Sequence, residues 1–248
     1  MIQFRSLKDI TFNDIFNAFR EAFKDYEMQL DKDGLYQMLI RRGFVKELSF
    51  GAFDGKKLVS FTFNGIGRYY GEKTAYDTGT GTIEQYRGQG LASRVFKHSI
   101  PFLKEAGISQ YLLEVLQHNE NAVSLYRNQG FDVSREFNYY IQENEKVQPN
   151  NKLLIKEYQV RKMNYSLAES LVVFHDFPPS WQNSFAAIKR KPEDFVSFGV
   201  FHKNELVGYC IFEPTTGDIT QIAVKPEHRR KRLGSYLLVK AISTNKHK

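Results

Sequence analysis

The chain contains two copies of one pattern of strands, turns and helix, and this internal repeat restricts the architectures that it can adopt. FGAFDGKKLVSFTF, which begins at Phe50, aligns with FGVFHKNELVGYCIF, which begins at Phe198, and both read as two strands joined by a polar turn. Further along, IEQYRGQGLASRVFKHSI aligns with KPEHRRKRLGSYLLVKAI, so that Arg87 matches Arg229. Two domains of related fold are therefore expected.

A polar stretch between the two copies is the best candidate for a linker. QENEKVQPNNK, over residues 142–152, carries a proline and has the composition of a connecting segment. We therefore predict a first domain over residues 1–142, a linker over 143–152 and a second domain over 153–248.

Composition indicates a globular protein. The chain has 248 residues, of which 42% are hydrophobic, and it contains no run of about eighteen apolar residues that could cross a membrane. The N-terminus, MIQFRSLKDI, lacks the layout of a signal peptide, and the single cysteine, Cys210, can form no internal disulfide. We expect a cytoplasmic protein without a membrane partner, in which Cys210 is a buried structural thiol.

The first copy reads as a mixture of strands and helices. A strand over residues 2–6 precedes an amphipathic helix with Ile15 and Phe19 on its apolar face. After it come a helix near 35–42, strands over 47–53, 57–63 and 74–82, a helix over 88–106, a strand over 111–116, a helix over 121–129, and closing strands after Phe131. Pro101 is expected to kink or interrupt the long helix. This order predicts a mixed, mostly antiparallel α/β sheet flanked by helices, in two copies with the second incomplete.

A glycine-rich turn separates a strand from a helix in GTGTIEQYRGQGLASRVF, over residues 79–96. Free backbone N–H groups at the helix N-terminus, together with the helix dipole, favour an anion there. Gly88 and Gly90 leave room for a phosphate against the backbone, and Arg87 can add a charge-assisted hydrogen bond. The Walker pattern does not occur, and a dinucleotide fingerprint would need a glycine where Glu84 stands. The turn therefore predicts a diphosphate site.

Two motifs in this region resemble those of the GNAT superfamily of N-acetyltransferases. R-x-x-G-x-A, formed by Arg87, Gly90 and Ala92, resembles the pyrophosphate-loop motif of that family. LLEVLQHNENAVSLYRNQGF, from Leu112, resembles the second motif, with a strand, an asparagine, N-x-x-A-x-x-x-Y and a closing Gly-Phe. The two motifs occur in the order of the family, and the resemblance covers essentially all of residues 1–142.

The resemblance implies transfer of an acetyl group from acetyl-CoA, as co-substrate and without a metal, directly to a primary amine. It places the pyrophosphate on the turn, the pantetheine arm along the preceding strand, and the thioester where that strand and the strand after the helix splay apart. The acceptor that it implies is a small-molecule or peptide amine, which the sequence does not identify. The implied coenzyme-binding residues are Thr80, Gly81, Thr82, Arg87, Gly88, Gln89, Gly90, Leu91, Ala92, Ser93, Asn119 and Asn121.

The resemblance also implies catalytic roles. Tyr126 matches the general acid that would protonate the departing thiolate, and its other reading is an aromatic side chain packed beneath the sheet. Asn119 matches an asparagine near the pantetheine arm, or it caps the helix that follows. The base that takes the proton of the amine stays open among Asp77, Glu84, Glu114 and a water chain.

The second copy departs from the family pattern at the turn and at its end. In HRRKRLG, Arg230 and Arg232 replace glycines, and a side chain at the second position would crowd a phosphate. The counterpart of Tyr126 would fall beyond Lys248. We therefore expect a non-catalytic, degenerate or truncated second domain, whose open sheet edge packs against the first domain or forms a homodimer.

Two other classes of function compete with the enzyme. A ligand-binding or regulatory protein could keep the coenzyme pocket without turnover, but the intact turn at Arg87 together with Tyr126 favours catalysis. Nucleic-acid binding is suggested only by the net charge of +7 and by HRRKR, and no zinc spacing, helix-turn-helix or stacking motif supports it. We expect no nucleic-acid partner.

Overall fold

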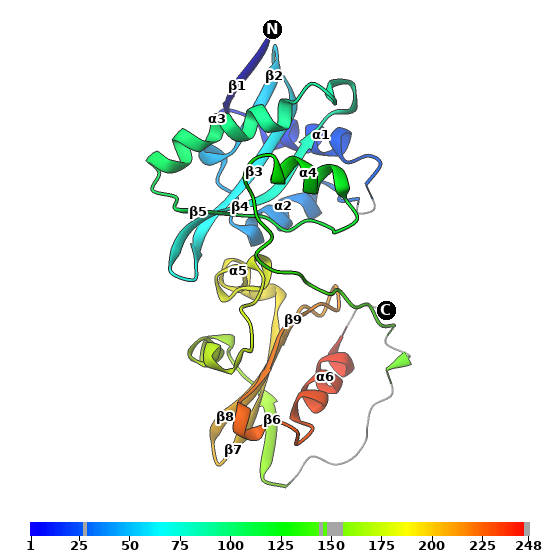
Figure 1. Ribbon diagram of the computed structural model, residues 1–248. Helices are drawn as coiled ribbons and strands as arrows, with labels where there is room; N and C mark the ends of the chain where they lie inside the picture. The colour runs from blue at the N-terminus through cyan, green and yellow to red at the C-terminus, as the bar shows by residue number, and fades with distance from the viewer. Residues whose placement is uncertain (27–28, 144–145, 148–155, 246–248) are drawn as a thin grey trace. The chain divides into compact units, whose positions relative to one another are not determined.

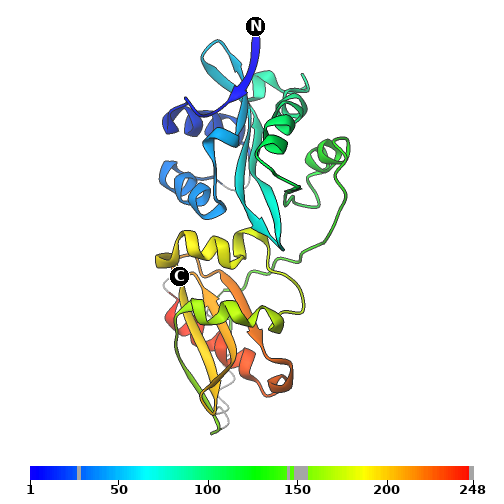
Figure 2. The ribbon, with the colours of Figure 1, turned by 90° about the vertical axis from the view of Figure 1, so that its left-hand side faces the viewer.

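The computed structural model divides into two compact units, Met1–Glu136 and Phe137–Lys248 (Figure 1, Figure 2). It describes residues 1–26, 29–143, 146–147 and 156–245. Most of the predicted linker over 143–152 therefore lies outside the described residues. In the described part of the chain, no helix is long and apolar enough to cross a membrane.

The first unit is one mixed sheet with helices on both faces (Figure 1). Its strands lie in chain order, and each neighbouring pair is antiparallel except the last, which is parallel. The strands are β1 (Ile2–Ser6), β2 (Phe50–Asp54), β3 (Lys57–Tyr69), β4 (Glu72–Thr82) and β5 (Gln110–Leu112). The helices are α1 (Phe12–Ala22), α2 (Lys32–Arg42), α3 (Leu91–Glu105) and α4 (Glu120–Arg127).

Side chains of β3 contribute to a hydrophobic core on each face of this sheet. Leu58, Phe61 and Phe63 belong to the cluster that includes buried side chains of α1 and α2. Val59 points to the other face and belongs to the cluster that includes Leu91 of α3. Therefore α1 and α2 cover one face of the sheet and α3 covers the other. The strand β4 contacts all three helices.

Local sequence sets where the helices begin and whether they continue. Thr11 caps α1 by accepting from the N–H of Asp14, and Asp31 caps α2 by accepting from the N–H of Gly34. Pro101 lies inside α3, which runs on past it. The proline removes one backbone donor, and the packing of the helix on the sheet keeps the helix intact.

One extra residue in β4 breaks its regular pairing with β3. Phe63 pairs with Gly79 and Asn64 pairs with Asp77, so Thr78 is an extra residue that forms a β-bulge. The hydroxyl of Thr78 donates to the main-chain oxygen of Phe63 at 3.2 Å. Because a bulge bends its strand, this irregularity redirects the second half of β4.

The last strand pairs with β4 over a short length only. β5 runs parallel to β4 from Thr74 to Tyr76. Between Asp77 and Thr82, the outer edge of β4 has no strand partner among the described residues. The two strands therefore separate at the level of Asp77, and main-chain groups of β4 are left available on that side.

The segment that follows α4 differs from the sequence prediction. We predicted closing strands after Phe131, and this was wrong, because residues 132–142 form no strand and most of their side chains are exposed. Tyr139 and Tyr140 are 80% and 85% exposed. Alternating apolar residues become a strand only where an edge of sufficient length accepts them. β5 offers three residues, fewer than the strand predicted over 111–116.

The second unit repeats the hairpins and the long helix of the first. Its antiparallel sheet consists of β6 (Tyr158–Lys162), β7 (Val196–His202), β8 (Glu205–Phe212) and β9 (Ile219–Val224). Its α-helices are α5 (Phe185–Arg190) and α6 (Leu233–Thr244), and a 3-10 helix spans Tyr165–Phe174. Cys210 in β8 is fully buried, and burial raises its pKa to about 12. The expectation of a buried structural thiol is confirmed.

The correspondence between the copies extends to close packing. A Cβ added to Gly51 would lie 2.3 Å from Cδ1 of Leu58. A Cβ added to Gly199 would lie 2.7 Å from Cδ1 of Leu206, the matching leucine. Both copies therefore need glycine at this position for the same steric reason.

The bulge is also repeated in the second copy. Ile211 pairs with Gln221 and Phe212 pairs with Ile219, so Thr220 is the extra residue of β9. Thr220 stands nine residues before Arg229, as Thr78 stands nine residues before Arg87 in the first unit. The two units therefore share strand register as well as strand order.

Candidate functional site

The turn before α3 adopts the backbone conformation that an anion site requires. Gly88 and Gly90 have φ angles of 75° and 67°, in the left-handed region. Gly90 is the N-cap of α3, and no side chain caps the helix there. A Cβ added to either glycine would meet no atom within 4 Å, so the space over the turn is open. The first N–H groups of α3 therefore face a site without a side-chain acceptor.

Arg87 connects this turn to two other elements. Its Nε donates to the main-chain oxygen of Thr82 at 3.2 Å, and its Nη2 donates to that of Ala22 at 2.8 Å. Ala22 is the last residue of α1, and Thr82 is the last residue of β4. Arg87 thus fixes the turn against the ends of both elements, and its predicted contact with a phosphate stays a prediction.

The strand before the turn is tightly packed on its inner side. A Cβ added to Gly81 would lie 2.8 Å from Cζ of Phe61 and 3.0 Å from Cβ of Ala22. Thr82 and Ser60 share a hydroxyl hydrogen bond at 2.8 Å. The glycine is therefore required by packing, and on the other side the main-chain edge of the same strand has no strand partner among the described residues.

Tyr126 and Asp77 meet where β4 and β5 separate. Oη of Tyr126, on α4, donates to Oδ2 of Asp77, on β4, at 2.8 Å. The hydroxyl of Thr80 donates to the same oxygen at 2.6 Å, and the N–H of Gly79 donates to Oδ1 at 2.9 Å. Asp77 is 8% exposed. Residues 49 positions apart in sequence are thus joined into one polar group around a buried carboxylate.

Burial controls the electrostatics of this pair. Burial raises the pKa of Asp77, although the hydrogen bonds from Thr80, Tyr126 and Gly79 act to lower it. Burial, and next the charge of Asp77, raise the pKa of Tyr126. The tyrosine therefore holds its proton firmly, and the aspartate takes up a proton more readily than an exposed carboxylate does.

Of the three carboxylates predicted as candidate bases, Asp77 is the one that is hydrogen-bonded to Tyr126. Glu84 lies in a 3-10 turn after β4 and forms an exposed ion pair with Lys24, whose hydrogen bond lowers the pKa of Glu84. Glu114 follows β5, is exposed, and contributes to the raised pKa of Tyr76.

Asn119 and Asn121, the residues of the second motif predicted to bind the coenzyme, lie at the N-terminus of α4. Oδ1 of Asn119 accepts from the N–H of Ala122 at 3.2 Å, so this asparagine caps α4 in the structure. Asn121 is exposed in the first turn of that helix. At the other turn, Gln89 is exposed between the two glycines, and Ala92 and Ser93 lie half-buried in the first turn of α3.

Three residues that sequence reasoning did not single out shape the site. The rings of Tyr126 and Phe131 lie 5.6 Å apart with their planes at 73°, which holds the tyrosine by edge contact. Tyr111 of β5 packs on Phe131 and donates to Oδ1 of Asn64 at 2.6 Å. Nη1 of Arg42 donates to the main-chain oxygen of Thr78, at the bulge, at 3.0 Å. The closing Gly-Phe of the second motif was the one available signal for Phe131.

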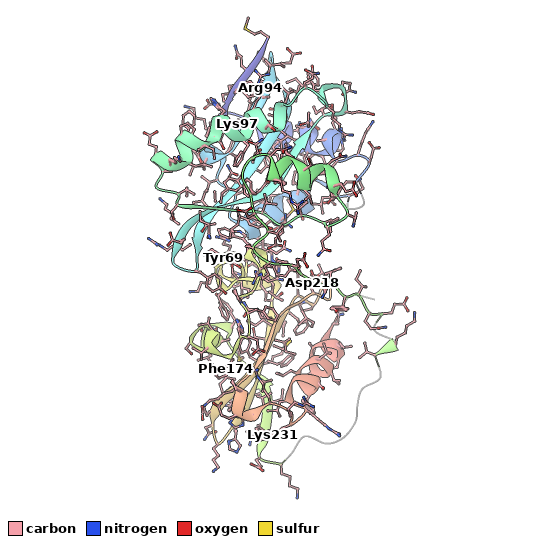
Figure 3. The ribbon with its side chains drawn as sticks, viewed as in Figure 1. Tyr69, Arg94, Lys97, Phe174, Asp218 and Lys231 are labelled. Carbon is pink, nitrogen blue, oxygen red and sulfur yellow. The ribbon has the colours of Figure 1, made fainter. Side chains whose placement is uncertain are left out.

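Further positive charge in the first unit lies on α3 and on the segment after α4. Arg94 and Lys97 are exposed on α3 (Figure 3), and the guanidinium of Arg94 lies 4.6 Å from the ring centroid of Phe4. In the segment after α4, Nη2 of Arg135 donates to Oη of Tyr69, on β3, at 3.1 Å.

Among the described residues, no three His, Cys, Asp or Glu side chains are grouped so as to hold a metal ion.

The corresponding turn of the second unit keeps the backbone and changes the side chains. Arg230 and Arg232 have φ angles of 61° and 64°, matching the left-handed conformations of Gly88 and Gly90. Arg232 is the N-cap of α6, as Gly90 is of α3. Both arginines are exposed. The second copy thus retains the shape of the turn, with long side chains at both positions that are glycine in the first.

Comparisons with known proteins cover both units. The model of the Acetyltransferase (GNAT) family matches residues 11–131 and, separately, 160–247. The chain is similar to N-alpha-acetyltransferase 30 of Schizosaccharomyces pombe, with 29% identity over 119 residues that cover 46% of this chain and 79% of the relative.

Two solved structures resemble almost the whole chain in fold. A tandem GNAT protein from the clavulanic acid biosynthesis pathway covers 98% of this chain and 85% of its own, with 14% identity and a TM-score of 0.68. A glucosamine N-acetyltransferase region of a fungal multi-domain GH3 β-N-acetylglucosaminidase covers 97% of this chain and 34% of its own, with 13% identity and a TM-score of 0.67. The predicted mixed α/β fold in two copies is confirmed.

Proposed function

This chain belongs to the acetyltransferase (GNAT) family and is an N-acetyltransferase, and we propose that its first unit transfers the acetyl group of acetyl-CoA directly to a primary amine. The observation that carries the proposal is the hydrogen bond between Tyr126 and Asp77 at the point where β4 and β5 separate. A proton donor and a carboxylate there lie beside the unpaired edge of β4.

In this proposal, the coenzyme binds to two main-chain surfaces of the first unit: the turn before α3 and the unpaired edge of β4. The N–H groups from Gly88 to Ser93 bind the pyrophosphate, because the left-handed glycines leave them uncovered and the dipole of α3 favours negative charge. The main-chain edge of Thr80–Thr82 binds the amide groups of the pantetheine arm, as an added strand would. The thioester supplies an activated acetyl group for attack by the amine.

The acceptor is the amine of a peptide or small molecule. The match to N-alpha-acetyltransferase 30 supports the α-amine of a peptide as the first acceptor to test. In the catalytic step, Tyr126 gives its proton to the departing sulfur. Asp77, as the carboxylate in contact with that tyrosine, is the first candidate for the base.

The second unit is a non-catalytic partner domain in this proposal. Its turn carries exposed Arg230 and Arg232 where the first unit's turn carries glycines, and a side chain at these positions would crowd a phosphate on the backbone. Its β9 edge is without a strand partner among the described residues, which suits contact with a second copy of the chain.

Calorimetric titration with acetyl-CoA tests the coenzyme site. Gly90→Glu places a carboxylate on the N-cap of α3, and Arg232→Glu places the same side chain on the matching N-cap of α6. We expect one site per chain, lost in Gly90→Glu and retained within threefold in Arg232→Glu. Loss through Arg232→Glu alone would move the coenzyme to the second unit, and no binding by the native chain would overturn the proposal.

Turnover is tested by release of free thiol from acetyl-CoA in the presence of amines. A panel of short peptides with free N-termini, the same peptides with blocked N-termini, polyamines and amino sugars separates the acceptor classes. Thiol release that requires an unblocked amine supports the proposal. A chain that binds acetyl-CoA and releases thiol with none of these amines would leave only a ligand-binding role.

A further inference from the structure

We propose that Asp77 and Tyr126 form a single proton relay, in which Asp77 takes the proton that the acceptor amine loses and passes it to Tyr126 as Tyr126 gives its own proton to the departing sulfur. This inference rests on the proposed function and adds one claim to it: the base and the acid are one hydrogen-bonded unit, and no proton is exchanged with solvent during the transfer.

The hydrogen bonds fix the carboxylate and leave it room for one more donor. Oδ2 of Asp77 accepts from Tyr126 and from Thr80, and Oδ1 accepts from the N–H of Gly79. A carboxylate has two acceptor positions on each oxygen. Oδ1 has a second acceptor position, and Oδ2 gains one when the hydroxyl of Thr80 turns to Thr62. Because Oδ2 also contacts Oη of Tyr126, Oδ2 is the oxygen that takes the proton of the amine and passes it to Tyr126.

The single hydroxyl proton of Tyr126 couples the two roles. While Asp77 is ionised, that proton is committed to Oδ2 and is not available to a leaving group. Once Asp77 carries a proton, its own O–H can donate to Oη of Tyr126, and the phenolic proton is free to turn toward the sulfur. Tyr126 is therefore a competent acid only after Asp77 has acted as a base.

Thr80 allows this exchange without leaving a buried group unpaired. Its hydroxyl donates to Asp77 at 2.6 Å and also lies 3.1 Å from Oγ1 of Thr62. When Asp77 becomes protonated, the hydroxyl of Thr80 can turn to Thr62. The relay thus has a place for each hydrogen bond in both of its protonation states.

The charged and titratable groups around the pair suit this cycle. Arg42, from α2, lowers the pKa of Asp77, but burial outweighs it and the net direction is upward. Tyr76 and Tyr111 flank the pair, and burial raises the pKa of each, so both stay neutral. Tyr111 donates to Asn64, which keeps its proton out of the relay.

The atoms balance within one turnover. The amine nitrogen forms a bond to the carbonyl carbon, and the bond from that carbon to sulfur breaks. One proton moves from nitrogen to Asp77, one from Tyr126 to sulfur, and one from Asp77 to Tyr126. The carboxylate and the phenol are restored, and the net change is one proton moved from nitrogen to sulfur.

Steady-state kinetics of the full chain with acetyl-CoA and a peptide amine test the relay. The variants are Asp77→Asn, Tyr126→Phe and the double variant. Each single change is expected to lower kcat by about 100-fold or more. Because the two groups act as one unit, the double variant should fall within about threefold of the worse single variant. Binding of acetyl-CoA by calorimetry, unchanged within threefold, shows that each variant is folded.

The chain offers a matched control outside the site. Oη of Tyr86 donates to Oδ2 of Asp54 at 2.9 Å, which is the same pairing at an exposed position. Asp54→Asn should change kcat less than threefold. A second readout is the dependence of kcat on the fraction of deuterium oxide, which is curved when several protons move in one step and linear when one moves.

Two failures can be told apart. If the native chain is active and the losses in Asp77→Asn and Tyr126→Phe multiply in the double variant, the relay is overturned and the acetyltransferase stands. A linear dependence on deuterium oxide in the active native chain would overturn the relay in the same way. Binding of acetyl-CoA without turnover of any amine would overturn the relay together with the proposed function.

Discussion

Arg229 makes in the second unit the two main-chain hydrogen bonds that Arg87 makes in the first. Nε of Arg87 donates to Thr82 at 3.2 Å and Nη2 donates to Ala22 at 2.8 Å. Nε of Arg229 donates to Val224 at 2.9 Å and Nη2 donates to Phe174 at 2.8 Å. In each unit the first acceptor stands five residues before the arginine. The shared arginine therefore joins a strand end, a preceding helix and the turn, whether or not the turn binds a coenzyme.

Removal of either arginine is expected to destabilise its own unit. Arg87→Ala and Arg229→Ala each leave two main-chain oxygens without their charged donor, at a cost of about 1–3 kcal/mol. Only Arg87→Ala should also weaken acetyl-CoA binding, because the proposed function assigns the coenzyme to its turn alone. Thermal unfolding and calorimetric titration measure the two effects. Equal loss of binding in both variants would contradict the assignment of the coenzyme to the first unit.

Gly81→Ala should destabilise the first unit by overpacking. The new methyl group would lie 2.8 Å from Phe61 and 3.0 Å from Ala22, so rings and backbone must shift. Overpacking of this kind costs about 1–3 kcal/mol. Urea unfolding measures the cost, with Gly79→Ala in the same strand as a control, since an added Cβ there would come no closer than 3.7 Å to its neighbours. An unchanged unfolding midpoint for Gly81→Ala would show that the packing around β4 is looser than described.

The buried aspartate predicts how stability changes with pH. The pKa of Asp77 in the folded chain lies above its ordinary value of 3.8, so the folded state binds this proton more tightly than the unfolded state. The contribution of Asp77 to stability is therefore greatest below pH 3.8 and falls as pH rises toward its raised pKa. The stability of native chain minus that of Asp77→Asn, from urea unfolding at successive pH values, should decline across this window. A difference that rises with pH would reverse the predicted sign.

Cys210 should react with thiol reagents only after the second unit unfolds. Its side chain is fully buried, and its pKa of about 12 leaves almost no thiolate near neutral pH. Titration with a chromogenic disulfide should therefore give almost no colour from the folded chain and one thiol per chain in denaturant. Rapid labelling without denaturant would mean that β8 opens readily.

Periodicity and glycine placement made much of the fold predictable. The strand over residues 2–6 has the predicted bounds, and the space over Gly88 and Gly90, which were expected to leave room against the backbone, is open. These features depend on neighbouring residues, and so they are visible in sequence. The strands predicted after Phe131 depended on the length of β5, which local sequence does not set.

The site was predictable only as a set of candidates. Tyr126, Asp77, Glu84 and Glu114 were all expected near the chemistry, but their pairing depends on how α4 lies against β4. That placement comes from packing around Phe131 and Tyr111, which lie far apart in sequence. Asn119 shows the same limit, because its type suits both a cap and a ligand contact, and the structure shows the cap.

The repeated bulge carries information about ancestry. Thr78 and Thr220 occupy the same register in their strands, yet the hydroxyl of Thr78 is hydrogen-bonded whereas that of Thr220 is buried with no partner in the described chain. One extra residue at the same place in both halves is most simply inherited from a single-copy ancestor whose strand was already bent. A duplicated unit would keep this bend, and the second half does keep the backbone of the turn that follows it, although Arg230 and Arg232 stand where the first half has glycines.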